Sequence, residues 1–273
     1  MTASENLDCK DLERLSAFAH ELADLSEPSI LSRFRRLGSV DNKAEAGAYD
    51  PVTEADRDVE KAIRAAIAKA YPDHRIIGEE FGVGGGSGEI SWVLDPIDGT
   101  KAFVTGSPLW GTLIGMTVSG RPVLGLMNQP FTQERYWSDG QQAKYRRSSG
   151  EELELQTRRC ANLSDAVLST TSIDLLQPGF EQERFEALST HIRMRRFGGD
   201  CYAYCLLAAG HIDLVVETGL NPYDIVAMIP IIEHAGGAIS QWNEGDAAAG
   251  GRIVAAGDAD IHRAALEILA GAL

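Results

Sequence analysis

The sequence predicts a mixed α+β and α/β fold, with an antiparallel-rich first half (about residues 1–155) packed on an alternating second half (about residues 156–273). Two observations lead to this prediction. In the first half, short β-like runs follow one another after two helical segments, whereas β-like and helical patterns alternate in the second half. A length of 273 residues suits one unit made of two closely packed halves.

The composition is that of a globular protein with an acidic surface. Hydrophobic residues make up 44% of the chain, which is enough for a packed core, and the formal net charge is −15. A field of this sign repels nucleic-acid backbones and anionic membranes, so we expect neither as a partner. The N-terminal residues lack the cationic start and apolar run of a secretory signal, and no apolar stretch is long enough to span a bilayer. Because the four cysteines form no CxxC pair, we expect a reducing, cytoplasmic location.

In the first half, leucine and alanine recur at helical spacing over residues 7–25 and predict an amphipathic helix. A polar connector, residues 41–50, leads to Thr53, which we expect to cap a second helix that ends before Pro72. Ser119-Gly120 predicts a hairpin turn between two strands. The strands predicted in this half are residues 75–77, 92–94, 111–118, 123–127, 135–138 and 143–146.

In the second half, the alternating pattern predicts strands at residues 167–170, 213–216 and 252–255, and helices at residues 181–190, 201–209, 222–235 and 261–269. The glycine-rich residues 82–88 match neither nucleotide-binding fingerprint, because no GxGxxG register closes and no Gly-Lys-Ser/Thr follows. We therefore predict a mobile surface connection there.

Acidic side chains follow or begin four of the predicted elements. Asp56 lies on the opening turn of the second helix, and Glu79 follows the strand ending at Ile77. The string from Asp95 to Thr100 follows an apolar strand, and Asn221-Pro222 places Asp224 in a first helical turn. Any one of these acids could be an ordinary helix cap or a solvated turn residue, so the site depends on whether they converge.

The string Asp95-Pro96-Ile97-Asp98-Gly99-Thr100 has the composition of a metal and phosphate site. Asp95 and Asp98 can face a common point with the Ile97 carbonyl between them, and Gly99 allows close approach to a ligand. The amides of Gly99 and Thr100 could hold an anion. Converging carboxylates about 4 Å apart repel by roughly 4 kcal/mol at a surface-like dielectric, so they need a cation. With oxygen ligands and no His or Cys in these segments, Mg²⁺ is favoured over Zn²⁺.

These motifs together resemble the inositol monophosphatase-like phosphatases over nearly the whole chain. The resemblance rests on Glu79 after its strand, the Asp95–Thr100 string, residues 53–56, and Asp224 before a helix that ends at Gly236-Gly237. It implies a layered αβαβα sugar-phosphatase-like fold, a homodimer, and a Mg²⁺-dependent site between the two halves.

Within this family the chain is most similar to the histidinol-phosphatase branch, which acts in histidine biosynthesis. Lys101-Ala102-Phe103 follows Thr100 where inositol-type members usually carry an uncharged residue and Asn-Phe. The segment from Gly198 to Tyr204 resembles that branch's substrate segment, and Asn221-Pro222-Tyr223-Asp224 replaces the Trp-Asp of inositol-type enzymes.

The resemblance also implies roles for individual residues. Glu79, Asp95 and the Ile97 carbonyl would hold one Mg²⁺. Asp95, Asp98 and Asp224 would hold a second, and a third ion is sometimes bound near Glu79. Asp56 would accept a proton from Thr100, whose oxygen orients the attacking water. Gly99 and Thr100 amides would hold phosphate oxygens, and Lys101 is either a phosphate contact or a solvated side chain.

Substrate choice is expected to depend on Asp200 and Glu217. Two acids facing the leaving group suit the amine and imidazole of histidinol phosphate. Asp200 could equally be the N-cap of the helix that follows it. The expected activity is hydrolysis of L-histidinol phosphate, with lithium sensitivity implied by the resemblance. Two alternatives stay open: the same chemistry on inositol 1-phosphate or another small sugar phosphate, and a non-catalytic sensor of a phosphorylated metabolite.

Overall fold

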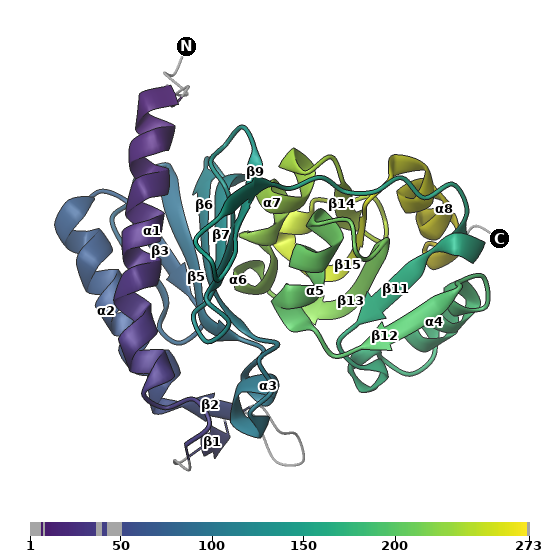
Figure 1. Ribbon diagram of the computed structural model, residues 1–273, viewed down its shortest axis with the longest axis horizontal. Coiled ribbons are helices and arrows are strands. Elements are labelled where there is room, and N and C mark those ends of the chain that lie inside the picture. The colour runs from purple at the N-terminus through teal and green to yellow at the C-terminus, as the bar shows by residue number, and fades with distance from the viewer. Residues whose placement is uncertain (1–6, 8, 37–39, 43–50, 272–273) are drawn as a thin grey trace.

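Two β-sheets separate three layers of helices, which gives the αβαβα order that the family resemblance implies (Figure 1). The computed structural model describes residues 7, 9–36, 40–42 and 51–271. Most of the predicted polar connector, residues 43–50, and the side chain of Thr53 lie outside the described residues. Among the helices described, none is both long and apolar enough to cross a membrane.

The first outer layer consists of α1 (Cys9–Leu31) and α2 (Glu54–Ala70), which pack on the large sheet. Their apolar faces join one core cluster with the sheet, in which Leu22, Ile63 and Trp92 are completely or almost completely buried. α1 runs past its predicted end at residue 25, because Ile30 continues the same buried face by a further turn.

The large sheet has eight strands in the order β10-β9-β8-β7-β6-β5-β3-β4. Only β3 and β5 pair in parallel, and the predicted hairpin joins β6 and β7 with Ser119 and Gly120 both at positive φ. The strands of this half, including the small β1–β2 pair, are β1 (Val40–Asn42), β2 (Pro51–Thr53), β3 (Arg75–Gly78), β4 (Gly82–Gly85), β5 (Ile90–Asp98), β6 (Gly111–Val118), β7 (Arg121–Gln129), β8 (Glu134–Ser138), β9 (Ala143–Arg146) and β10 (Glu152–Glu154), with the short helix α3 (Thr100–Thr105) after β5.

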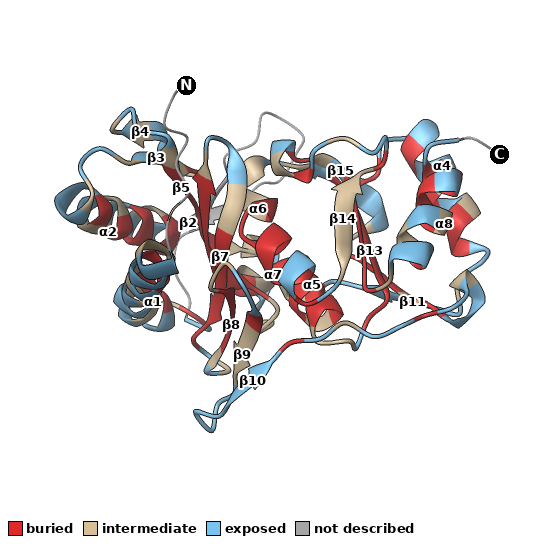
Figure 2. Ribbon diagram, turned by 90° about the horizontal axis from the view of Figure 1, so that it is seen from above, coloured by how far each residue is buried: buried red, intermediate tan, exposed pale blue. Residues whose placement is uncertain are grey.

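The second sheet has the order β12-β11-β13-β15-β14 and is covered on both faces. α5, α6 and α7 fill the layer between the two sheets, and α4 and α8 cover the far side (Figure 2). The elements are β11 (Val167–Thr170), α4 (Phe180–Ser189), β12 (Met194–Phe197), α5 (Asp200–Ala208), β13 (Leu214–Leu220), α6 (Pro222–Ile225), α7 (Met228–His234), β14 (Ala238–Gln241), β15 (Gly251–Ala256) and α8 (Ala259–Leu269).

Two predictions about these elements are wrong, and strands without an apolar pattern were missed. The glycine-rich segment is not simply a loose connection, because its residues Gly82–Gly85 form β4 and pair with β3. The strands β12 and β14 were not expected, because β12 is exposed along its whole length and β14 is only half-buried, which removes the apolar alternation of a strand. The helix expected over residues 222–235 is two helices, α6 and α7.

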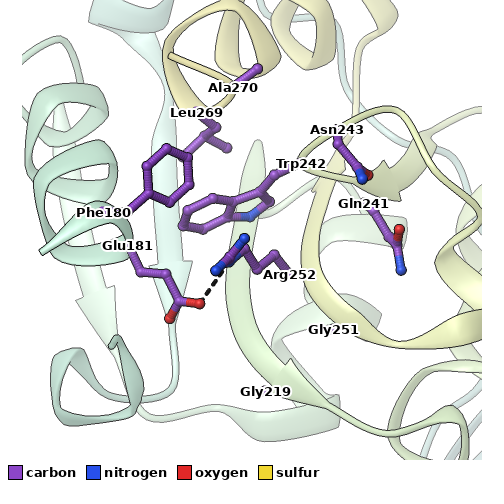
Figure 3. Close-up of a pocket in the computed structure, with 10 residues that line it drawn as sticks. All are labelled: Phe180, Glu181, Gly219, Gln241, Trp242, Asn243, Gly251, Arg252, Leu269 and Ala270. Atoms are coloured by element: carbon purple, nitrogen blue, oxygen red, sulfur yellow. Dashed lines mark hydrogen bonds and ion pairs between the residues drawn. The ribbon is translucent and has the colours of Figure 1, made fainter. Parts of the chain in front are cut away.

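A cavity of about 450 Å³ lies on the outer side of the second sheet (Figure 3). Its wall includes Trp242 and the ring of Phe180, over which the Arg252 guanidinium lies at 5.2 Å. Glu181 of α4 accepts a hydrogen bond from Arg252 Nε of β15 at 2.6 Å. This ion pair ties the outer helix layer to the sheet.

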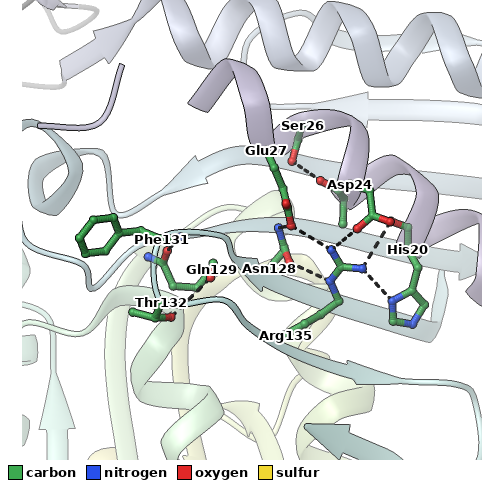
Figure 4. Close-up of polar contacts among 10 residues, drawn as sticks. His20, Asp24, Ser26, Glu27, Asn128, Gln129, Phe131, Thr132 and Arg135 are labelled. Atoms are coloured by element: carbon green, nitrogen blue, oxygen red, sulfur yellow. Dashed lines mark hydrogen bonds and ion pairs between the residues drawn. The ribbon is translucent and has the colours of Figure 1, made fainter. Parts of the chain in front are cut away.

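Arg135 of β8 is a fully buried cation that ties α1 to the large sheet (Figure 4). Its guanidinium donates to Asn128 Oδ1 at 2.7 Å and to Asp24 Oδ1 at 2.6 Å, and it also reaches Glu27. Nη1 lies 3.0 Å from Nδ1 of His20, which acts as the acceptor in its neutral form. Because a buried cation needs several partners, this network fixes the position of α1 on the sheet.

We predict that His20 makes the fold sensitive to mild acid. Burial, and then the Arg135 charge, lower the pKa of His20 from 6.5 to about 4. Below pH 6.5 His20 binds a proton in the unfolded chain, whereas in the folded chain it stays neutral down to about pH 4. The free energy of unfolding is therefore highest above pH 6.5 and falls as the pH is lowered towards 4. Between these two pH values, urea unfolding should show that the wild type loses on the order of 2 kcal/mol more of its free energy of unfolding than His20→Gln does. This value is smaller than the full pKa shift would give, because the ring is partly exposed and its charge is screened by solvent. Parallel losses in both proteins would contradict this account.

Candidate active site

The end of β5 supplies two acids to one point because the strand is irregular there. In a regular strand, residues three apart point to opposite faces. The pairing of β5 with β6 shifts register between Asp95 and Asp98, so a bulge turns the two carboxylates to the same side. The Pro96 carbonyl within this bulge accepts a hydrogen bond from Thr112 Oγ1 at 2.8 Å. The bulge is therefore held by the neighbouring strand.

A third acid comes from the other half of the chain. Asn221 and Asp224 form a capping box at the start of α6, with Pro222 at its first position, as predicted. Ligand oxygens of Asp95, Asp98 and Asp224 all lie within 4.8 Å of one another. Residues separated by about half of the chain thus meet between the two halves.

Each of these three carboxylates is held by one backbone N–H. Asp95 Oδ1 accepts from Ile97 N at 3.0 Å, and Asp98 Oδ2 accepts from Cys201 N at 2.7 Å. Asp224 Oδ2 accepts from Asn221 N at 2.7 Å. Because one oxygen of each group is fixed in this way, the orientation of the whole cluster is set before any ligand binds.

The electrostatics of the cluster favour a bound cation. Burial, and then the charges of Glu79, Asp98 and Asp224, raise the pKa of Asp95 well above its usual range. Burial and the charges of Asp200 and Asp224 do the same to Asp98. Mg²⁺ prefers oxygen ligands, and the three carboxylates each bring an oxygen within 4.8 Å of the others. The all-oxygen donor set therefore fits divalent ions of this kind.

Glu79 lies beside Asp95 because of the parallel pairing of β3 with β5. Gly78 is opposite Leu94 in this register, and Glu79 N donates to the Leu94 carbonyl at 3.2 Å. The carboxyl ends of the two strands therefore bring Glu79 and Asp95 to the same sheet edge, where their side chains interact. Asp56, in the first turn of α2, is 1% exposed, which is unusual for a carboxylate.

The residues after Asp98 open the short helix α3. Gly99 is its N-cap, with φ of 85°, a left-handed conformation that favours glycine. Thr100 Oγ1 donates to the Ile97 carbonyl at 3.1 Å. The hydroxyl predicted to be catalytic is therefore in contact with the carbonyl predicted to be a metal ligand. Lys101 is exposed, and its charge partly offsets the effect of burial, which raises the pKa of Asp200, so the two side chains lie near each other.

Asp200 lies next to this turn, and Glu217 lies near Asp200. A Cβ on Gly99 would lie 3.2 Å from Cγ of Asp200, so the Asp200 carboxyl faces Gly99 directly. Burial raises the pKa of Asp200 to about 6 and that of Glu217 to about 8, and the Asp200 charge contributes to the latter shift. Asp200 is not the N-cap of α5, contrary to the alternative prediction, because Gly199 takes that position. Its φ of 44° is a strained value of the kind that clusters at functional sites.

Sequence reasoning missed two supports of the site. Thr171 donates both its N–H and its hydroxyl to Glu217 Oε1, at 2.7 and 3.0 Å, and its oxygen accepts from Asp200 N at 3.2 Å. Its position just beyond the carboxyl end of β11 is a signal that could have indicated it. The second support is the N–H of Cys201 on Asp98, which the sequence does not reveal because it is a contact between the two halves.

The layered fold and its cluster of acidic oxygens are those of a phosphatase that acts on small phosphorylated substrates, of a metal-dependent class that typically uses Mg²⁺. A model of the Inositol monophosphatase family matches residues 11–272. The chain belongs to this family.

Named relatives agree with this assignment. The bifunctional phosphatase IMPL2, chloroplastic, of Arabidopsis thaliana is 41% identical over 270 residues, covering 95% of this chain and 76% of that protein. A histidinol-phosphatase of Streptomyces coelicolor is 34% identical and covers 81% of this chain and 84% of its own. The solved structure of an inositol monophosphatase from Zymomonas mobilis superposes with a TM-score of 0.82 at 39% identity, covering 97% of this chain and 100% of that one.

Proposed function

We propose that this protein is a Mg²⁺-dependent phosphomonoesterase that hydrolyses L-histidinol phosphate to L-histidinol and phosphate. The observation that carries the proposal is a second pair of acids beside the carboxylate cluster, the half-buried Asp200 and the buried Glu217. Histidinol phosphate carries an amine and an imidazole that can be cationic. A cation placed beside these acids favours their ionised forms, so the binding of substrate and the ionisation of both acids reinforce one another.

The acidic residues divide into two proposed ion sites. Glu79, Asp95 and the Ile97 carbonyl would hold one Mg²⁺, Asp95, Asp98 and Asp224 would hold another, and a third ion would bind near Glu79. When bound, Mg²⁺ neutralises these carboxylates, polarises phosphoryl oxygens and makes water more acidic. The carboxylates of Asp95, Asp98 and Asp224 contribute orientation because each accepts a hydrogen bond from a backbone N–H. The Ile97 carbonyl is held by the Thr100 hydroxyl.

The remaining residues act on the proton and on the phosphate. Asp56 is proposed to accept the proton of Thr100, whose oxygen then orients the attacking water. The Gly99 and Thr100 amides hold phosphate oxygens in line for this attack, and Lys101 is available to the same phosphate from the solvent side. The reaction needs no covalent intermediate on the protein.

A second candidate is the same reaction on inositol 1-phosphate. It is favoured by the structural likeness to the Zymomonas mobilis protein, which is described as an inositol monophosphatase. Kinetics on histidinol phosphate, inositol 1-phosphate and fructose bisphosphate separate the two candidates. We expect the highest kcat/KM for histidinol phosphate; a preference for inositol 1-phosphate would replace the first proposal with the second.

We predict that Asp200→Asn lowers kcat/KM for histidinol phosphate by about 10–100-fold, since a hydrogen bond between charged groups contributes about 1.5–3 kcal/mol. Inositol 1-phosphate has a neutral leaving group and should lose much less. The check is steady-state kinetics of both substrates with one enzyme preparation. An equal loss on both would mean that Asp200 supports the site in general and does not select the substrate.

Three further expectations belong to this proposal. A homodimer is checked by light scattering, and lithium inhibition by a Li⁺ titration of phosphate release. A cytoplasmic location is checked by cell fractionation.

A further inference from the structure

Glu60 is a fully buried carboxylate in the middle of α2, where an unpaired charge would be strongly unfavourable. Glu60 contacts the two residues that follow Glu79 in the chain, and it also contacts Arg64. Glu60 Oε2 accepts from Glu80 N at 2.7 Å, and Oε1 accepts from Phe81 N at 3.2 Å. Arg64 Nε donates to Oε1 at 2.7 Å and neutralises the charge. Glu60 thus holds the backbone immediately after the proposed metal ligand.

The chain around Glu79 is also constrained on the N-terminal side of this residue. Gly78 precedes Glu79, and a Cβ at this position would lie 2.1 Å from Glu60 Oε1. Its backbone is outside the left-handed region, so the glycine is required here for space and not for conformation. Arg64 in turn donates to the Gly82 carbonyl. The carboxylate and its arginine therefore contact the chain both before and after Glu79.

The same helix face carries Asp56, one turn before Glu60, and both side chains are buried. Residues four apart lie above one another on a helix, so a single rigid element reaches both groups. The proposed proton acceptor and the turn that carries Glu79 are therefore set relative to each other by α2.

We propose that Glu60 is a positioning residue for the metal site: it fixes the turn after β3 so that Glu79 meets Asp95 at a distance suited to a divalent ion. The inference rests on the proposed Mg²⁺ dependence. Groups that hold metal ligands in place typically change metal affinity by about 10–100-fold when they are replaced. In Glu60→Gln, an amide N–H₂ faces either a backbone N–H or Arg64, so at least one of these hydrogen bonds is lost.

The test measures the Mg²⁺ dissociation constant by calorimetry and the Mg²⁺ concentration that gives half-maximal activity. Glu60→Gln should raise both of these quantities by about 10–100-fold, while kcat at saturating Mg²⁺ recovers most of its wild-type value. Glu181→Gln is the matched control: Glu181 is also buried and accepts from one backbone N–H, of Gln177, and from Arg252 Nε, but it lies on α4 in the outer layer (Figure 3). It should leave Mg²⁺ affinity unchanged.

Gly78→Ala provides a second variant that alters no charge. Its methyl group displaces the Glu60 carboxylate, so it should weaken Mg²⁺ binding in the same direction, whether or not Glu60→Gln folds. In a Glu60→Ala background the methyl group has space, and its effect on Mg²⁺ affinity should shrink. Wild-type Mg²⁺ affinity in Glu60→Gln or in Gly78→Ala would overturn the inference about Glu60 and leave the proposed function standing. A wild-type protein that binds no Mg²⁺ would overturn the proposed function as well.

Discussion

Replacing Asp95 with asparagine should reduce turnover by more than about 100-fold, beyond the range seen when groups behind a metal ligand are changed. Asp95 is 2% exposed and interacts with Glu79, Asp98 and Asp224. It is the acid that the proposal assigns to both ion sites. Asparagine keeps the shape of the side chain and its oxygen can still accept from Ile97 N. The loss should therefore be confined to the charge that a divalent ion needs.

The stability of this variant should change in a characteristic way. Without Mg²⁺, Asp95→Asn should be at least as stable as the wild type, because carboxylates about 4 Å apart repel by roughly 4 kcal/mol at a surface-like dielectric. With saturating Mg²⁺, the wild type should gain melting temperature and the variant should not, since only an ion bound to the folded state stabilises it. Thermal unfolding with and without Mg²⁺ measures both effects. A variant that melts earlier without Mg²⁺ would mark Asp95 as a structural residue.

Replacing Asp56 with asparagine should lower kcat by about 10²–10⁴-fold, the usual contribution of a general acid or base. Asp56 is proposed to take the Thr100 proton, and it belongs to neither proposed ion site. Mg²⁺ affinity should therefore stay within a few-fold of the wild-type value. This pattern is the opposite of the one expected for Glu60→Gln, which should change Mg²⁺ affinity and largely keep kcat.

The control for Asp56 is Glu54→Gln on the same helical turn. Glu54 is exposed, whereas Asp56 is 1% exposed, so the two variants remove the same charge at nearly the same place in the chain. Kinetics with Mg²⁺ titrated for each variant compare them directly. If Asp56→Asn loses Mg²⁺ affinity in parallel with kcat, Asp56 is a ligand or a support of the metal site and not the proton acceptor.

Much of the fold could be predicted because the buried elements carry clear patterns. The helix predicted to end before Pro72 is α2, and the apolar run predicted as a strand before Asp95 is part of β5. The elements that were missed have no such pattern. β4 consists of glycine and one exposed valine, and it is a strand only because the edge of β3 offers hydrogen bonds to its backbone.

The candidate site shows the same division between local and tertiary signals. The convergence of Asp95 and Asp98 was predicted from their string, although the bulge that permits it depends on pairing with β6. The capping box that places Asp224 is entirely local, which is why Asn221-Pro222 predicted it correctly. The contacts of Cys201 on Asp98 and of Thr171 on Glu217 link residues 103 and 46 positions apart, and no local pattern encodes them.

The most direct test of this account is phosphate release from L-histidinol phosphate by the purified full chain, measured after chelation and then during stepwise addition of Mg²⁺. We expect negligible release without divalent ions and saturable release once Mg²⁺ is restored. Turnover that persists unchanged in the chelator would show that the acidic cluster does not work through bound cations. Binding of the ester with no hydrolysis at any Mg²⁺ concentration would instead identify a sensor.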